Sequence, residues 1–282
     1  MAVKKTLSRM GRLFAIAAKI DMMWLLRDTK FALLCIAGDV FINLATLSGV
    51  FLIAVRFGGI GGMSADEVLF MMGYSTVITG LFGLFGSGNN IHISRIIGRG
   101  QLEHLFMQPL SLKMQLFTCG FCPFTGSGNL LSGIVLTAVA IGRIGLHPSP
   151  AWFLALALQL AATMTIIVGR SYLVSTLAFY APVAAEEISS TVIDEGWVLG
   201  TFPLSGMPRF IVIPLLTILP EGLMAWLPTL ILLGKAPHSY LTYYPMIFAL
   251  LLALVTAFVF RKGLNHYVKK GTNRYVPYGY RR

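Results

Sequence analysis

Long apolar segments dominate this sequence and decide what it can fold into. Six of them have the length and composition of membrane-spanning helices, and they lie at 31–55, 67–88, 115–141, 151–180, 209–219 with a continuation, and 243–260. A helix needs about 20 mostly apolar residues to cross a hydrocarbon core roughly 30 Å thick. The chain that remains is too short for a further soluble domain of ordinary size. The sequence therefore predicts an all-α integral membrane protein, with six transmembrane helices in one domain over 1–282.

The placement of charge supports this prediction and orients it. Charged residues make up only 12% of the chain, whereas soluble domains average about 25%. Seven of the 22 Lys and Arg residues lie before residue 31, three between residues 90 and 115, and seven from residue 261 onward. Basic residues beside membrane segments favour the cytoplasmic side. We therefore expect both termini, including the basic tail 261–282, on the cytoplasmic side of a plasma membrane. The net charge of +11 then reflects lipid contact, and we expect no nucleic-acid partner.

The residues before the first span, 1–30, have the pattern of an amphipathic helix. Apolar and basic residues fall on opposite faces at helical spacing, and the apolar face ends in Trp24. Helices of this kind lie in the interface of an anionic leaflet. A solvated basic tail is the alternative. The first apolar run is longer than the apolar core of a cleaved signal peptide, so we expect it to remain as a span.

The fifth span is predicted to be irregular. Prolines interrupt it at positions 203, 208, 214, 220 and 228. Proline inside a helix removes a backbone hydrogen bond and kinks the helix. Two forms are open for 221–234: the second half of a bent span, or a re-entrant pair of half-helices at the outer surface. Four acidic residues that precede this region are expected in a cytoplasmic loop that could contact another protein, namely Glu186, Glu187, Asp194 and Glu195.

Three charges fall within or beside the predicted spans. A charge near the bilayer centre costs roughly 2.5–3.5 kcal/mol on insertion scales, so each should face protein or water. Asp39 could line a translocation path or pair with Arg170, and Arg209 could mark the cytoplasmic edge of the fifth span. The second span also carries a series of small residues that predict a close helix contact. They are Gly80, Gly83, Gly86 and Gly88.

Nucleotide-binding and catalytic motifs are missing from the sequence. Nothing matches GxxxxGK[ST], because Gly234 and Lys235 are followed by Ala. The five His residues stand singly, without the spacing of a zinc site or a helical His pair. Cys119 and Cys122 form a CxxC pair in an apolar run, where we expect simple packing. We therefore expect no enzyme activity, no metal and no cofactor on this chain, and any ATP and Mg²⁺ would be bound by a separate subunit.

The loop between the second and third spans, residues 95–111, carries the most specific pattern, and we call it the elbow. Glycines set off a short helix at 101–107, which Pro109 ends. Leu102, Leu105 and Phe106 could anchor this helix in the groove of a partner. An elbow that only lies on the membrane fits the pattern equally well. The candidate residues of this site are Gly100, Gln101, Leu102, Glu103, Leu105, Phe106, Pro109 and Leu110.

The elbow sequence from Gly100 to Ser111 resembles the pattern G-x-L-[DE]-x-x-L-x-x-P-L-S of the corresponding loop in ABC-2 type permeases, with Phe106 in place of the second leucine. These permeases are six-span membrane subunits of ATP-driven exporters. Further similarities follow in order along the chain, at Phe202-Pro203-Leu204, Ile218-Leu219-Pro220 and Arg261-Lys262-Gly263-Leu264. Gln108 departs from the family pattern, because a basic residue usually precedes the proline. The tail also lacks the tryptophan that often precedes its basic pair.

This resemblance implies a function and a set of partners. The helix at 101–107 would be a coupling helix that docks on a cytoplasmic ABC ATPase dimer, which binds the ATP and Mg²⁺. A second copy of the permease, or a homologous permease, would complete the translocation path in a bacterial plasma membrane. Transport would be outward, and we expect the unidentified substrate to be amphipathic. From the residues alone, an ion-gradient-driven secondary transporter or channel is the alternative.

Overall fold

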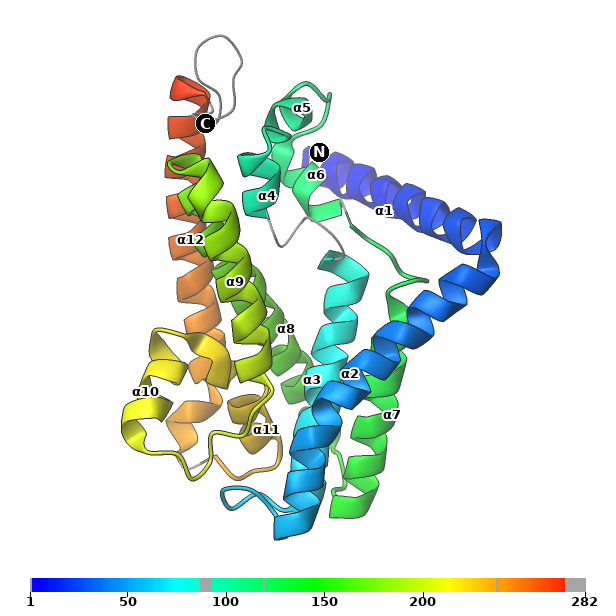
Figure 1. Ribbon diagram of the computed structural model, residues 1–282, viewed down its shortest axis with the longest axis vertical. Helices are drawn as coiled ribbons and strands as arrows, with labels where there is room; N and C mark the ends of the chain where they lie inside the picture. Colours follow the sequence, from blue (N-terminus) through cyan, green and yellow to red (C-terminus); the bar gives the residue numbers. More distant parts are fainter. Residues whose placement is uncertain (1, 87–92, 119, 237, 272–282) are drawn as a thin grey trace.

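The computed structural model describes residues 2–86, 93–118, 120–236 and 238–271 (Figure 1). These residues form helices and connecting turns, with one isolated bridge between Ile60 and Met63, so the predicted all-α fold is confirmed. The long helices are α1 (Ala2–Arg27), α2 (Thr29–Phe57), α3 (Ala65–Gly86), α7 (Ser127–Ile144), α8 (Pro150–Ser175), α9 (Pro182–Gly200) and α12 (Tyr244–Lys270). The short ones are α4 (Ile93–Gly98), α5 (Leu102–Phe106), α6 (Leu112–Thr118), α10 (Arg209–Thr217) and α11 (Trp226–Leu232), with 3-10 turns η1 (Thr176–Phe179), η2 (Pro220–Leu223) and η3 (Ser239–Thr242).

The long helices run between two ends of the molecule. The start of α1, the end of α12 and the short helices α4, α5 and α6 lie together at what we call the terminal end (Figure 1). The turn between α2 and α3 and the helices α10 and α11 lie at the opposite, distal end (Figure 1). Within the described residues, α2, α3, α7, α8 and α12 are long and apolar enough to cross a membrane. These five helices confirm the membrane-embedded character of the chain.

Helix α9 corrects the prediction for the acidic region. Glu186, Glu187, Asp194 and Glu195 lie on this helix of 19 residues, so the predicted loop is wrong. The helix begins at the terminal end and leads the chain toward the distal end (Figure 1). It was missed because its four carboxylates lower its hydropathy below that of the neighbouring spans. The chain thus passes between the two ends six times, in α2, α3, α7, α8, α9 and α12.

The course of α9 also decides the form of the fifth predicted segment. Helices α10 and α11 both lie at the distal end, and η2 separates them (Figure 1). The pair is bent by 72° between Thr217 and Pro220. Helix α9 has already brought the chain to the distal end, and α12 starts there. The segment 209–232 therefore begins and ends at the same end of the molecule. This is the arrangement of a re-entrant element, and Arg209 lies at the distal end, whereas the prediction placed it on the same side as the termini.

The third span begins later than predicted. Helix α7 starts at Ser127, whereas the apolar run starts near 115. Helix α6 precedes it and ends before a loop that contains Gly120, at φ 90°, and Pro123. Cys119, one half of the CxxC pair, lies outside the described residues. Hydropathy alone cannot separate a span from a short apolar helix that leads into it.

The amphipathic helix predicted over 1–30 forms as α1 and lies across the terminal end (Figure 1). The Asp28 side chain caps the following helix α2 by accepting a hydrogen bond from the Phe31 amide, at 3.2 Å. Asp21 is buried and accepts hydrogen bonds from the Phe124 amide at 2.7 Å, the Thr125 amide at 3.2 Å and the Thr125 hydroxyl at 2.6 Å. These bonds fasten α1 to the loop that enters α7.

Helices α3 and α7 form the most extensive helix pair in the molecule. Gly80 lies against the backbone of Leu130, and a Cβ added at Gly83 would lie 3.1 Å from the Gly126 carbonyl oxygen. The predicted close contact along the second span is thus confirmed at Gly80 and Gly83. Gly86 ends α3, and Gly88 lies outside the described residues. The pair joins α8 through a hydrogen bond of 2.9 Å between the Tyr74 and Thr163 hydroxyls.

Candidate functional site

The elbow contains α5 and lies between α4 and α6 at the terminal end. Gly100 stands between α4 and α5 with φ 69°, a left-handed conformation that glycine adopts without strain. It reverses the chain so that α5 begins at Leu102, with Gln101 before it and Met107 after it. The predicted short helix is therefore present within 101–107, and its two ends are held by α4 and α6.

One face of α5 is anchored inside the protein. Leu102 is 0% exposed and packs in a terminal-end cluster with Ile97, Phe179 and Tyr267. The Tyr267 hydroxyl also donates a hydrogen bond to the Glu103 carboxylate, at 3.3 Å. Leu102 cannot serve as an anchor for a partner, contrary to the prediction, because its side chain stabilises the elbow from within.

Gln115 braces the elbow from the next helix. Its side-chain amide donates to the carbonyl oxygens of Leu105 and Leu110, both at 2.8 Å. Gln115 is buried, so these bonds are shielded from water and rigidify the turn between α5 and α6. Gln115 was not among the predicted residues, although backbone carbonyls that a turn leaves unpaired commonly bind side chains.

The other face of α5 is open. Phe106 is 44% exposed and Met107 is 75% exposed, so they present two large apolar side chains side by side. Gln101, Glu103, His104 and Pro109 are exposed around them, whereas Leu105 and Leu110 are half-buried. We call Phe106 and Met107 the elbow tip. Met107 was not among the predicted residues, because the helical pattern alone does not show which face the protein itself covers.

The terminal-end cluster links the elbow to the long helices. Besides Ile93, Ile97 and Leu102 of the elbow region, it contains Phe179 of η1 and Ala185 of α9. The hydroxyls of Ser94 on α4 and Ser189 on α9 form a hydrogen bond. Through this cluster the elbow packs against α9 and, at Tyr267, against α12. Packed interiors can transmit displacements because they are not continuously deformable.

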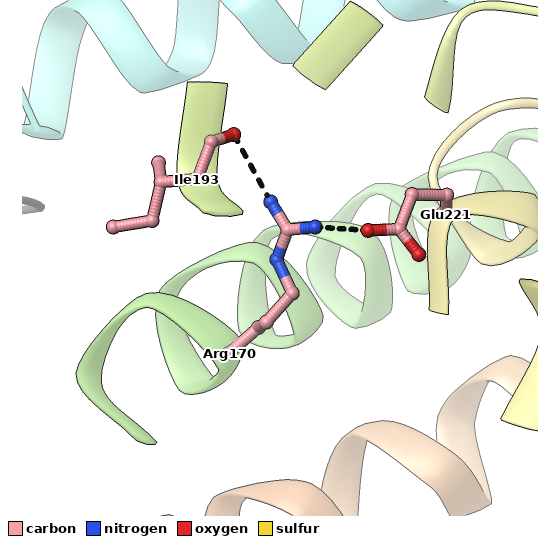
Figure 2. A network of polar contacts seen from close by, with 3 residues as sticks. All are labelled: Arg170, Ile193 and Glu221. Carbon is pink, nitrogen blue, oxygen red and sulfur yellow. Dashed lines mark hydrogen bonds and ion pairs between the residues drawn. The ribbon is translucent and has the colours of Figure 1, made fainter. Parts of the chain in front are cut away.

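Besides the elbow, the bundle contains a buried polar site between α8 and the re-entrant element. Arg170 forms a buried ion pair with Glu221 of η2, and its guanidinium also donates to the Ile193 carbonyl of α9, at 3.3 Å (Figure 2). Gly196 lies directly against the guanidinium, where any side chain would displace it. The charge of Arg170 is thus paired within the protein, as the cost of a charge in the membrane requires.

Asp39 does not take part in this site. It lies on the exposed side of α2 and forms no ion pair within the described part of the chain, so the predicted pairing with Arg170 is wrong. Glu221, the true partner, was missed because the sequence left the re-entrant form of its segment open. Arg170 Nε and the second carboxylate oxygen of Glu221, Oε2, have no hydrogen-bond partner among the described residues, so the pair is not fully satisfied.

Helix α9 has two different faces. Ala185, Ser189 and Ile193 are buried against the rest of the bundle. Glu187 and Glu195 are exposed, so this long helix carries carboxylates on a face that the described part of the chain does not cover.

Among the described residues, no group of three or more His, Cys, Asp or Glu side chains could hold a metal ion. The family model described as an ABC-2 family transporter protein matches residues 40–271, which is most of the chain. Neither a curated protein nor a solved structure matches the chain.

Proposed function

The chain belongs to the ABC-2 family of transporter proteins as its membrane domain, and from this premise we propose that it is the permease subunit of an ATP-driven exporter, moved at its elbow by a separate ATPase dimer. The ATP and Mg²⁺ would be bound by that dimer, because the sequence carries no phosphate-binding loop.

The observation that carries this proposal is the two-sided build of α5. Phe106 and Met107 project from the molecule, while Leu102 and Gln115 fix the same segment to the bundle. An exposed apolar pair on a short helix fits a groove on a partner. A rigid attachment behind it is what a mechanical coupling needs, because a loosely held loop would yield without moving the spans.

The exposed face of α9 supports a path formed by two permease copies. Glu187 and Glu195 lie on a helix that crosses between the two ends of the bundle, and lipid tails do not accommodate ionised carboxylates. Their natural environment is water or a second copy of the chain. We propose that α9 faces its counterpart across the path, and that ATP binding switches the pair between two arrangements of the helices.

The distribution of basic residues supports the proposed orientation of the chain in the membrane. The terminal end carries the lysines and arginines of α1, the elbow and the end of α12, which favours the cytoplasm. The elbow would then face the ATPase, and the re-entrant element would face the cell exterior. Family resemblance favours export over import.

The double variant Phe106→Glu with Met107→Glu tests the coupling. Two charged side chains at the elbow tip should weaken binding of the ATPase by at least about thirtyfold, since the loss of even one interface anchor costs roughly 2 kcal/mol. The measurement is ATPase retention, and transport-linked ATP hydrolysis, in the complex purified from membranes.

The matched control is Val268→Glu, a similar charge on an exposed apolar residue at the end of α12. It should leave retention unchanged. Normal retention and transport in the elbow variant would disprove the docking role. Transport by the purified chain alone, driven by a proton or sodium gradient without ATP, would instead establish a secondary transporter.

A further inference from the structure

A large cavity opens between the two halves of the bundle on the terminal side. Its volume is about 1560 Å³, and α3, α6, α8 and α12 line it. Drug-sized ligands occupy pockets of about 300–1,000 Å³, so this cavity suits a larger, elongated molecule. We call it the lateral groove.

The walls of the lateral groove are apolar and partly open to the outside. Phe85 of α3, Phe117 of α6 and Phe258 of α12 line it and are all exposed by more than a third of their surface. In a membrane-embedded chain, the surroundings of such side chains are acyl tails. An elongated apolar ligand therefore has direct access from the bilayer.

The length of the groove matches one leaflet. On α12 the lining extends from Ala253 to Asn265, which corresponds to about 18 Å at the helical rise of 1.5 Å per residue. One leaflet contributes about half of the roughly 30 Å hydrocarbon core. A lipid whose headgroup lies at the terminal end could thus place its tails along the whole groove.

Charge at the terminal end of the groove selects the headgroup. Lys113 of α6 and Arg261 of α12 both line it, and no acidic residue is present among the described residues of its lining. Both cations are exposed, and Ser111 and Asn265 stand near them in the chain and in the lining. Arg and Lys together bind phosphate oxygens well, Arg as a planar fork and Lys as a point charge.

We propose that the lateral groove holds one anionic phospholipid from the leaflet at the terminal end, with its phosphate between Lys113 and Arg261 and its tails against α3, α8 and α12. The two cations lie on helices from different halves of the chain, since α6 follows α3 and the elbow, whereas α12 packs on α8. A lipid in this position would connect the halves where the bundle itself leaves them apart. The proposal depends on the membrane-embedded fold and not on the proposed ATPase coupling.

Native mass spectrometry of the purified full chain tests the site. The protein is released from micelles that contain equal amounts of phosphatidylglycerol and phosphatidylcholine with identical acyl chains. The native chain should retain phosphatidylglycerol preferentially. The double variant Lys113→Gln with Arg261→Gln should lower that preference on the order of tenfold, because each cation near an anionic headgroup contributes to binding.

Two further variants separate the possible outcomes. Lys262→Gln with Lys269→Gln removes two exposed cations outside the groove and should leave the preference unchanged. Ala161→Trp fills the groove at an exposed lining residue and should reduce retention of both lipids. An equal loss of the phosphatidylglycerol preference in the two double cation variants would show a non-specific charge effect and overturn the proposal. Undiminished lipid retention in Ala161→Trp, or equal binding of the two lipids to the native chain, would also overturn it.

Discussion

Arg170 is held inside the bundle by Glu221 and by the Ile193 carbonyl, and these partners explain how α8 carries a charge among apolar residues. A buried ion pair adds little stability compared with apolar residues of similar size, but the loss of one partner leaves a buried charge without compensation. Because Glu221 lies at the bend of the re-entrant element, the pair fixes that element against α8 and α9. Its role is structural cohesion across three segments that are distant in sequence.

The variant Arg170→Met should therefore lower the free energy of unfolding by roughly 3–5 kcal/mol. The double variant Arg170→Met with Glu221→Met should recover most of that loss, because both charges are then removed. Equilibrium unfolding of the purified protein in mixed micelles measures both values. Arg143→Met is the matched control: Arg143 pairs with Asp66 at 3.6 Å in an exposed position, and its loss should cost less than about 1 kcal/mol. A double variant no more stable than Arg170→Met would contradict this account of the pair.

Single residues also show how far sequence reasoning reaches. The elbow helix and its glycine and proline boundaries could be predicted, because Gly100 and Pro109 have local conformational effects. The roles of Leu102 and Met107 could not, since they depend on whether α12 and η1 cover that side of the helix. Arg170 could be recognised as needing a partner, but its partner lies 51 residues away in a segment of open form.

At the scale of elements, hydropathy located the apolar spans. It failed for segments whose composition does not reflect their course through the bundle. It placed α2, α8 and α12 near their observed positions. It missed α9, whose four carboxylates lower its hydropathy below that of the other long helices. It also merged α6 with α7, because the intervening loop is almost as apolar as the helices. The loop is instead defined by a tertiary contact, the hydrogen bonds of Asp21 to Phe124 and Thr125.

The contact between α3 and α7 gives a prediction at this scale. A Cβ at Gly133 of α7 would collide with the backbone of Thr76 and Val77 on α3, whereas nothing described lies within 4 Å of one at Gly142 on the same helix. Gly133→Ala should lower the free energy of unfolding by about 1–3 kcal/mol through overpacking. Gly142→Ala should be neutral or raise it by up to about 1 kcal/mol, since alanine favours the helix. Thermal unfolding in detergent distinguishes them, and equal effects of the two substitutions would refute the close contact.

For the whole molecule, the structure places two kinds of element at opposite ends. The elbow, with its exposed tip, lies at the terminal end, and the re-entrant element lies at the distal end, connected to the bundle by the Arg170–Glu221 pair. Helix α9 contacts both, through the Ser94–Ser189 hydrogen bond near one end and Arg170 farther along. This path gives a physical route by which a push at the elbow would reach the other side of the membrane. The elbow and the irregular fifth segment could be predicted from the sequence. The contacts that connect them through α9 could not, because they arise only from packing.

We propose that the elbow faces the cytoplasm and that α9 carries the chain across the membrane, so that Arg209 lies outside the cell. Thiol labelling of intact cells with a membrane-impermeant reagent tests it most directly, in a background where Cys35, Cys119 and Cys122 are replaced. Met107→Cys and Arg209→Cys are compared, because both positions are exposed in the structure. The account predicts that position 209 is labelled in intact cells and position 107 only after permeabilisation. Labelling of position 107 from outside, or of both positions only from inside, would contradict it.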